Sequence, residues 1–155
     1  MTRRGTLVFA VILLITVGID QGSKAWARGL EPGRHPVISG YWEWEPAQNP
    51  GAAFSLLPGG TVVLALIAAG ALVGIGVAAA RTPAEQRLRL AGLALVGGGA
   101  LGHLLDRVRL GSVTDFVRWR IHEHLWPIFN VADAALLIGG VLLLAQRPAP
   151  RRLPA

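Results

Sequence analysis

The sequence predicts an all-α membrane protein with four transmembrane helices in one domain. Its 155 residues are 52% hydrophobic and 15% charged, whereas soluble domains are about 25% charged. Four apolar segments of roughly 18–20 residues are each long enough, at about 1.5 Å per residue, to cross a hydrocarbon core of about 30 Å. The segment 61–80 contains no charged residue and has no polar face, which excludes a soluble helical bundle.

The expected helices cover residues 6–26, 61–80, 88–105 and 128–145, within a transmembrane domain of residues 1–146. The first apolar stretch has the length of a signal peptide, but no A-x-A-like cleavage site follows it. We therefore expect a retained helix that continues past Asp20 to Trp26. Residues 147–155 are rich in Arg and Pro, and we expect them to form a disordered basic tail.

The distribution of charge predicts that both termini lie in the cytoplasm. The N-terminus, the loop between the second and third helices and the tail together carry eight arginines and one glutamate, which gives +7. The opposite side carries seven basic residues and eight acids, which gives −1. The positive-inside rule counts basic residues, which are nearly balanced here, and it gives little weight to acids.

Aromatic and β-prone residues predict a small sheet lying on the outer membrane surface. All five tryptophans and Tyr41 lie in the two outer connections, and such residues favour the level of the lipid headgroups. The stretch 37–45, bounded by Pro36 and Pro46, alternates in part between apolar and polar residues, as strands do.

The composition also excludes several classes of function. The chain has no cysteine, which rules out disulfides, thiolate chemistry and cysteine-bound zinc. A net charge of +6 is compatible with nucleic-acid binding. The basic residues, however, are scattered at the ends of apolar segments instead of forming one patch, so we expect no nucleic-acid partner.

Four aspartates lie at or near the outer ends of the predicted helices: Asp20, Asp106, Asp115 and Asp133. A charged group in the first turns of a membrane helix, as at position 133, is expected to face the bundle interior with a partner. A single aspartate there also fits a structural ion pair or an acid that interacts with the helix dipole. Three pairs are spaced to share a helix face: Asp20 and Lys24, His103 and Asp106, and Asn130 and Asp133.

Two carboxylates brought close together share one proton, because both cannot easily ionise. The ionised member takes a proton from water while the protonated member donates to a carbonyl oxygen, and this hydrolyses a peptide without a metal. The residues alone leave Asp106 and Asp115 as equal candidates for the partner of Asp133. We expect Asp115 in a connecting loop that folds back over the bundle.

Other chemistries are less well supported. The Ser23–Lys24 pair has the residue types of a serine–lysine protease, but adjacent helical residues point apart. The segment His122–His124 lacks H-E-x-x-H spacing and an evident third zinc ligand, so no metal is expected. Gly97–Gly102 matches G-x-G-x-x-G without a preceding strand, and its glycines are expected to permit close helix packing.

Five short motifs occur in a recognisable order along the four predicted helices: Asp20-Gln-Gly-Ser-Lys24, Asn49-Pro-Gly-Ala-Ala-Phe54, Gly102-His-Leu-Leu-Asp-Arg107, Gly111-Ser-Val-Thr-Asp-Phe116 and Phe129-Asn-Val-Ala-Asp133. Each motif alone is weak, but their order and spacing are specific. From about Leu7 to Ala145 the chain resembles lipoprotein signal peptidase (signal peptidase II).

The resemblance implies a monomeric aspartic endopeptidase of the bacterial inner or plasma membrane, surrounded by membrane lipid and needing no cofactor. Its substrates would be diacylglyceryl-modified prolipoproteins, cut just before the lipidated cysteine. By matching position, Asp115 and Asp133 would be the catalytic pair. The residues implied to hold the site or the substrate are Asp20, Lys24, Asn49, Gly51, His103, Asp106, Arg107 and Asn130.

The same resemblance implies a small extracytoplasmic β-cradle around residues 41–45, cytoplasmic termini and an active site near the extracytoplasmic surface. One position departs from the family pattern: His103 stands where the family usually has asparagine. Histidine also forms hydrogen bonds, but it titrates near neutral pH, which would alter the pH optimum or the fit of the substrate.

Two other classes of function are consistent with a helical membrane protein. A small transporter or proton-coupled channel would use its aspartates as relays. That reading predicts polar residues through the membrane depth, whereas segment 61–80 has no charge and the acids gather at one face. A purely structural membrane subunit would not need five polar motifs.

Overall fold

The computed structural model describes residues 2–51, 60–121 and 124–146. Predictions for the tail 147–155, for His122 and Glu123 and for the end of the Asn49–Phe54 motif fall outside these ranges. The described elements are α1 (Arg3–Arg28), β1 (His35–Ile38), β2 (Trp42–Asn49), α2 (Thr61–Arg81), α3 (Arg87–Leu110), β3 (Val113–Ile121), β4 (His124–Leu125) and α4 (Val131–Leu144).

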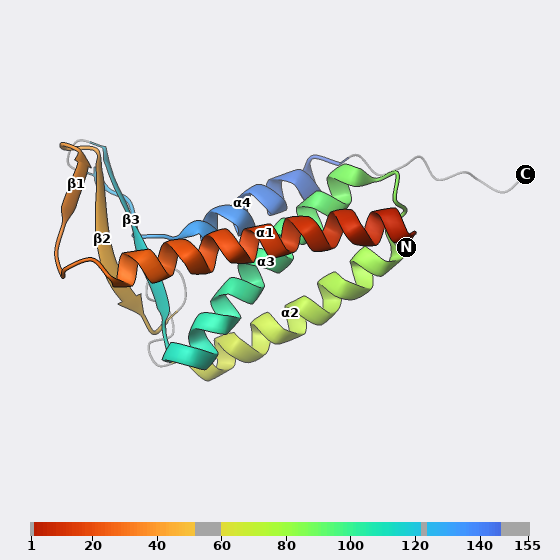
Figure 1. The fold of residues 1–155 in the computed structure, drawn as a ribbon, viewed down its shortest axis with the longest axis horizontal. Coiled ribbons are helices and arrows are strands. Elements are labelled where there is room, and N and C mark those ends of the chain that lie inside the picture. The colour runs from red at the N-terminus through yellow and green to blue at the C-terminus, as the bar shows by residue number, and fades with distance from the viewer. Residues whose placement is uncertain (1, 52–59, 122–123, 147–155) are drawn as a thin grey trace, which may run out of the picture.

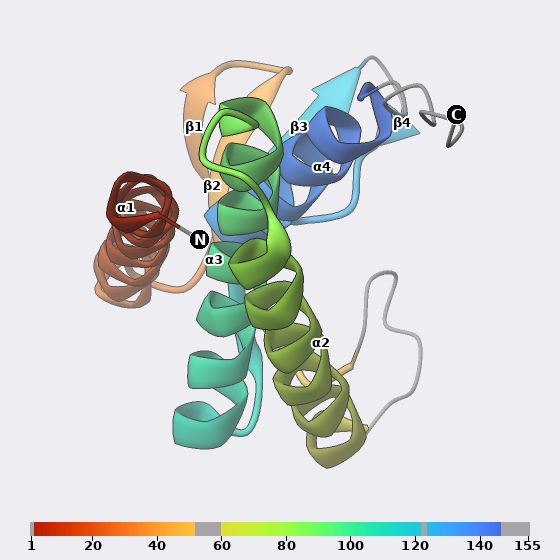
Figure 2. The ribbon, with the colours of Figure 1, turned by 90° about the vertical axis from the view of Figure 1, so that its right-hand side faces the viewer.

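Helix α3 is the centre of the helical bundle, and α1, α2 and α4 each pack against it (Figure 2). Its glycines permit this close packing, as the sequence predicts. A Cβ atom at Gly98 would lie 2.7 Å from the Thr16 side chain of α1. A Cβ atom at Gly102 would collide with the carboxylate of Asp20.

Among the described residues, α1, α2 and α3 are long and apolar enough to cross a membrane. All three lie where the sequence predicts helices, with different ends. The predicted helix 88–105 continues to Leu110 although its last turns are charged. It stops at Gly111, whose φ of 72° gives the left-handed conformation that commonly ends helices.

Helix α4 has 14 residues, so it is about 21 Å long at 1.5 Å per residue. The prediction that this helix begins at residue 128 is wrong by three residues. Phe129 is held in an extended conformation because it pairs with Val117 of β3. Asn130 then caps the helix, with its side chain bonded to the backbone of Asp133 and the Asp133 side chain bonded back.

The strands form one antiparallel sheet of order β1-β2-β3-β4 at one end of the helices (Figure 1). The predicted strand at 37–45 is present, but it is divided between β1 and β2, and β2 runs on to Asn49. The prediction that Asp115 lies in a loop is wrong. Asp115 lies on β3, opposite Ala47 of β2, and the end of α1 packs against this sheet through Trp26 and Phe116.

Two neighbouring glycines of α4 provide a direct test of the α3–α4 packing. A Cβ atom at Gly139 would lie 2.8 Å from the carbonyl oxygen of Gly92, whereas one at Gly140 meets nothing within 4 Å. We expect Gly139→Ala to destabilise the protein by roughly 1–3 kcal/mol, because backbone must move to relieve the contact. Gly140→Ala is the matched control, and we expect it to be neutral or slightly stabilising. Equal apparent melting temperatures for the two variants in detergent would contradict this packing.

Candidate active site

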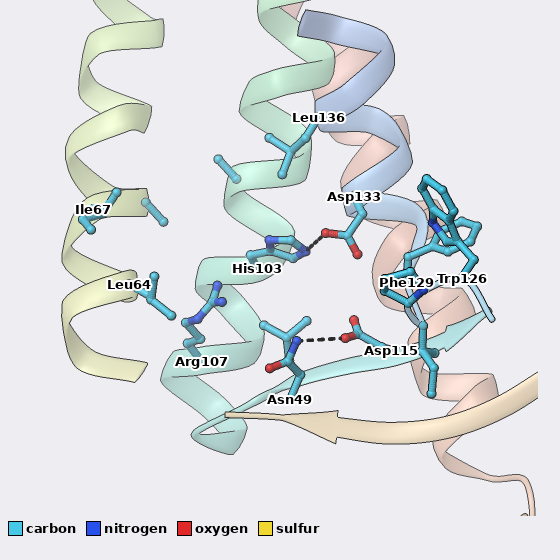
Figure 3. Close-up of a pocket in the computed structure, with 15 residues that line it drawn as sticks. Asn49, Leu64, Ile67, His103, Arg107, Asp115, Trp126, Phe129, Asp133 and Leu136 are labelled. Carbon is cyan, nitrogen blue, oxygen red and sulfur yellow. Dashed lines mark hydrogen bonds and ion pairs between the residues drawn. The ribbon is translucent and has the colours of Figure 1, made fainter. Parts of the chain in front are cut away.

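A pocket of about 450 Å³ lies between α2, α3, α4 and β3, next to the sheet (Figure 3). Its wall is apolar on the side of α2, where Leu64 and Ile67 lie, and polar where α3, β3 and the start of α4 meet. The polar residues that line it are Asn49, His103, Arg107, Asp115 and Asp133.

Asp115 is nearly buried in this pocket, with 6% of its surface exposed. Both of its carboxylate oxygens accept hydrogen bonds from amide side chains. Asn130 Nδ2 donates to Oδ1 at 2.6 Å, and Asn49 Nδ2 donates to Oδ2 at 3.1 Å. Because β2 and β3 are paired, Asn49 at the end of β2 reaches the acid on the neighbouring strand.

Asp133 lies in the first turn of α4, and 39% of its side chain is exposed. Its Oδ2 accepts a hydrogen bond of 3.0 Å from the backbone N–H of Asn130. Its Oδ1 lies 3.4 Å from Nε2 of His103 on α3. The positive end of the helix dipole also favours a negative charge at this position.

Asn130 links the two acids directly. Its side chain is fully buried, donates to Asp115 and accepts a hydrogen bond of 3.1 Å from the backbone N–H of Asp133. One asparagine therefore fixes the position of both carboxylates around the same pocket.

Burial raises the pKa of Asp115 to about 6 from an ordinary value of 3.8, and the negative charge of Asp133 acts in the same direction. The hydrogen bonds from Asn49 and Asn130 stabilise the ionised form and oppose this shift in the pKa. The two carboxylates thus interact electrostatically, and the more buried of the pair holds its proton more readily than a free aspartate does.

The other two aspartates have a different partner. Lys24 is fully buried, and its Nζ lies 2.9 Å from Asp20 and 3.1 Å from Asp106. This confirms the predicted pairing of Asp20 with Lys24. It also distinguishes the candidates that the residues alone leave equal, because Asp106 is paired with Lys24 whereas Asp115 lines the pocket with Asp133.

Each carboxylate of the Lys24 network also holds the backbone of an element that carries a pocket acid. Asp20 Oδ1 accepts a hydrogen bond of 2.9 Å from the N–H of Ala132, next to Asp133. Asp106 Oδ2 accepts one of 3.2 Å from the N–H of Thr114, next to Asp115.

Sequence reasoning did not single out two residues of this network, Gln21 and Thr114. Gln21 Nε2 donates to both Asp20 and Asp106, at 3.1 and 3.0 Å. Thr114 is fully buried, and its hydroxyl accepts hydrogen bonds from Arg28 and Gln48. Both lie inside the sequence motifs, Gln21 next to Asp20 and Thr114 next to Asp115, and that adjacency is the signal that points to them.

Gly51 and Arg107 extend the polar network beside the pocket. The N–H of Gly51 donates to Asn49 Oδ1 at 3.0 Å, and its carbonyl oxygen accepts from Arg107 at 3.1 Å. Gly51 therefore acts through its backbone, holding the amide that reaches Asp115. The charge of Arg107 lies close enough to interact with Asp115 and Asp133.

The geometry does not favour the serine–lysine alternative. Lys24 is held by two carboxylates, and the Ser23 hydroxyl donates to the carbonyl oxygen of Asp20 at 2.9 Å. No contact joins Ser23 to the Lys24 ammonium among the described residues, so this lysine does not activate that serine.

Solved structures with the same fold identify the class of protein. One bacterial membrane enzyme, determined at 2.3 Å by the in meso method, is 27% identical, has a TM-score of 0.81, and is matched over 88% of this chain and 84% of its own. A second, determined at 1.9 Å, is 28% identical with a TM-score of 0.78, over 88% and 89% of the two chains. The apolar helices with their small antiparallel sheet thus form the fold of a multi-pass membrane enzyme.

The family follows from sequence comparison. The family model described as signal peptidase (SPase) II matches residues 12–147. A lipoprotein signal peptidase of Xanthomonas euvesicatoria pv. vesicatoria is 39% identical over 90% of this chain and 84% of its own, and that of Xylella fastidiosa is 33% identical over 90% and 87%. The chain belongs to the signal peptidase II family, and it is therefore an aspartic-type peptidase.

The raised pKa of Asp115 predicts how stability depends on pH. Below about pH 3 the carboxyl group is protonated in the folded and the unfolded chain alike, because the ordinary pKa is 3.8. As pH rises towards the folded pKa of about 6, the unfolded chain loses this proton first, so the folded state loses stability. We expect Asp115→Asn, which carries no charge, to gain roughly 2–3 kcal/mol relative to wild type between pH 4 and 7.

Thermal unfolding of both proteins in detergent at several pH values measures this difference. The loss of one favourable amide contact lowers the stability of the variant by about 1 kcal/mol at every pH and does not change the trend. A stability difference that stays constant from pH 4 to pH 7 would contradict the raised pKa. Glu31→Gln, which removes an exposed carboxylate outside the pocket, is the control and should show no such trend.

Proposed function

We propose that this protein removes the signal peptide from diacylglyceryl-modified prolipoproteins and cuts on the N-terminal side of the lipidated cysteine. Asp115 and Asp133 would act as an aspartate dyad on a water molecule. The observation that carries the proposal is that these two acids line one pocket and are joined by the side chain of Asn130. The relatives named lipoprotein signal peptidase supply the class of substrate.

The surroundings of the two acids suggest separate roles. Asp115 is the more buried, and its pKa of about 6 lets it keep a proton to a higher pH than a free aspartate does. Asp133 is more exposed and lies at the start of α4, where the helix dipole stabilises negative charge. We therefore assign Asp115 as the general acid and Asp133 as the general base.

In the proposed reaction, Asp133 takes a proton from water while the water oxygen attacks the scissile carbonyl carbon. Asp115 donates its proton to the carbonyl oxygen, which gives a neutral tetrahedral diol. Collapse of the diol breaks the C–N bond, with Asp133 returning its proton to the leaving nitrogen and Asp115 recovering one from the diol. The products are a carboxyl group on the signal peptide and an amino group on the lipidated cysteine.

The shape of the pocket fits a substrate that stays in the membrane. Leu64, Ile67 and Leu136 provide an apolar wall between α2 and α4, against which a signal helix would lie (Figure 3). A second pocket of about 370 Å³ also reaches Asp115 from the side of the sheet, and it is lined by Gln48 and Arg118. We propose that water and the polar chain after the cleavage site use this second opening.

We also propose how the protein lies in the bilayer. The start of α1 and the end of α4 lie at the end of the bundle opposite the sheet (Figure 1). With both of these ends in the cytoplasm, α4 would be a fourth crossing that starts below the outer surface, at the depth of the site. The sheet would then form an extracytoplasmic cradle above a monomeric domain of residues 1–146 in the bacterial inner or plasma membrane.

Asparagine substitutions test the dyad. Asp115→Asn and Asp133→Asn each remove one titrating group, and we expect each to lower the rate of cleavage of a purified lipidated precursor by about 10³-fold or more. The measurement is the conversion of precursor to product on a gel, with membrane insertion of each variant checked in parallel. Glu31→Gln is the control and should cleave as wild type does.

The dyad would be contradicted if either asparagine variant inserts normally and still cleaves the precursor within tenfold of the wild-type rate. If wild type fails to cleave the lipidated precursor, the assigned substrate is wrong.

Because the chain has no cysteine, single-cysteine variants can test the proposed orientation. We expect Arg4→Cys and Gln146→Cys to react with a membrane-impermeant maleimide only when the cytoplasmic side is opened. Tyr41→Cys, on the exposed turn before β2, should react from outside in intact cells or spheroplasts. Labelling of positions 4 and 146 from opposite sides would contradict four crossings.

A further inference from the structure

We propose that His103 is a positioning residue that holds the general base, Asp133, through its Nε2–H group. The proposal rests on the dyad described above and concerns a residue to which that dyad gives no role. His103 lies on α3, lines the pocket, and has 14% of its side chain exposed. Its Nε2 atom lies 3.4 Å from Asp133 Oδ1 and 3.4 Å from Asn130 Oδ1.

The orientation of the Asn130 amide determines which nitrogen of His103 carries a hydrogen. Asn130 Oδ1 faces the backbone N–H of Asp133 at 3.1 Å, so this atom must be the carbonyl oxygen. A flipped amide would place two donors against each other there. The Nε2 atom of His103 therefore faces two oxygens, and it must be a donor.

The consequence is that each oxygen of Asp133 has a donor beside it. The backbone N–H of Asn130 binds Oδ2 at 3.0 Å, and Nε2–H of His103 lies beside Oδ1. The hydrogen bond of His103 Nε2 goes to Asn130 Oδ1, so its contact with Asp133 Oδ1 is an electrostatic one at 3.4 Å. This contact from α3 and the capping bond from α4 together orient the carboxylate. Without the histidine N–H, only the capping interaction holds this side chain.

Protonation of the imidazole changes the strength of this interaction. Nε2–H is present in the neutral ring and in the cation, so the contact persists, but the cation adds a positive charge beside Asp133. An ion pair makes Asp133 a weaker base towards water, so the cleavage rate should fall when His103 becomes charged. The charged groups that act on this ring are Asp133 of α4, Lys24 of α1 and Arg107 of its own helix.

Three variants separate this role from a purely structural one. His103→Ala removes the donor, and we expect kcat to fall about tenfold or more with KM little changed, as for the loss of a hydrogen bond to a charged group. His103→Asn keeps an N–H donor that does not titrate, and we expect it to recover most of kcat. His35→Asn, on β1 with its ring bonded to the backbone oxygen of Glu31, is the matched control.

The deciding measurement is the ratio of cleavage rates, His103→Asn over wild type, between pH 4 and pH 8. Titration of Asp115 and Asp133 affects both proteins and cancels in the ratio to a first approximation. We expect the ratio to rise severalfold as pH falls, because only wild type acquires the imidazolium. A ratio that does not change with pH, or wild-type kcat in His103→Ala, would overturn the proposal.

A second measurement does not depend on activity, so it distinguishes a failure of this inference from a failure of the proposed function. ¹⁵N NMR of histidine-labelled protein, with the signal of His103 assigned from His103→Asn, reports which ring nitrogen is protonated. We expect the Nε2–H form in wild type above the titration of the ring. A neutral ring with its hydrogen on Nδ1 would overturn the proposal even if the enzyme cleaves its substrate.

Discussion

The buried ammonium group of Lys24 is the interaction on which the rest of the site depends. It lies between Asp20 and Asp106 with no exposed surface, so both ion pairs are removed from water. Removing one partner of such a network leaves an uncompensated buried charge, which typically costs 3–5 kcal/mol. The presence of a buried ion network is by itself weak evidence for stability. Here the network matters because it positions the elements that carry the pocket acids.

Position follows from the further hydrogen bonds that the two carboxylates accept. Asp20 contacts Lys24 through Oδ2 and holds the N–H of Ala132 with Oδ1, whereas Asp106 contacts Lys24 and holds the N–H of Thr114 with the same oxygen, Oδ2. The elements held in this way carry the acids next in sequence, Asp133 and Asp115. The same ion network thus sets the start of α4 and the start of β3 relative to α1 and α3. It gives four aspartates two roles, because two are paired with one lysine and two face a pocket.

Sequence reasoning finds those features that depend on local pattern. Helices α1, α2 and α3 follow from their apolar runs, and the Asp20–Lys24 pair follows from its spacing of four residues. The role of Asp106 does not follow, because its pairing with Lys24 joins residues far apart in the chain. The motifs place Asp115 near the site, and only the family resemblance distinguishes it from Asp106.

Strand β3 escapes prediction because its partner β2 lies more than sixty residues earlier and no local turn joins them. Its first residues, Val113 to Val117, are buried on both faces and show no alternating pattern. The start of α4 escapes prediction for a similar reason. Phe129 is apolar, so the sequence pattern assigns it to the helix. Its pairing with Val117 instead keeps its backbone in a strand conformation.

The central claim is that the carboxylates of Asp115 and Asp133 interact across one pocket. The chain has only four aspartates, so aspartate labelled with ¹³C at the side-chain carboxyl gives four resolvable NMR signals. Titration should give Asp115 a pKa near 6 in wild type. That pKa should be lower in Asp133→Asn, where burial still raises it but the neighbouring charge is gone. An ordinary pKa for Asp115 in wild type, or the same raised pKa in both proteins, would contradict the claim.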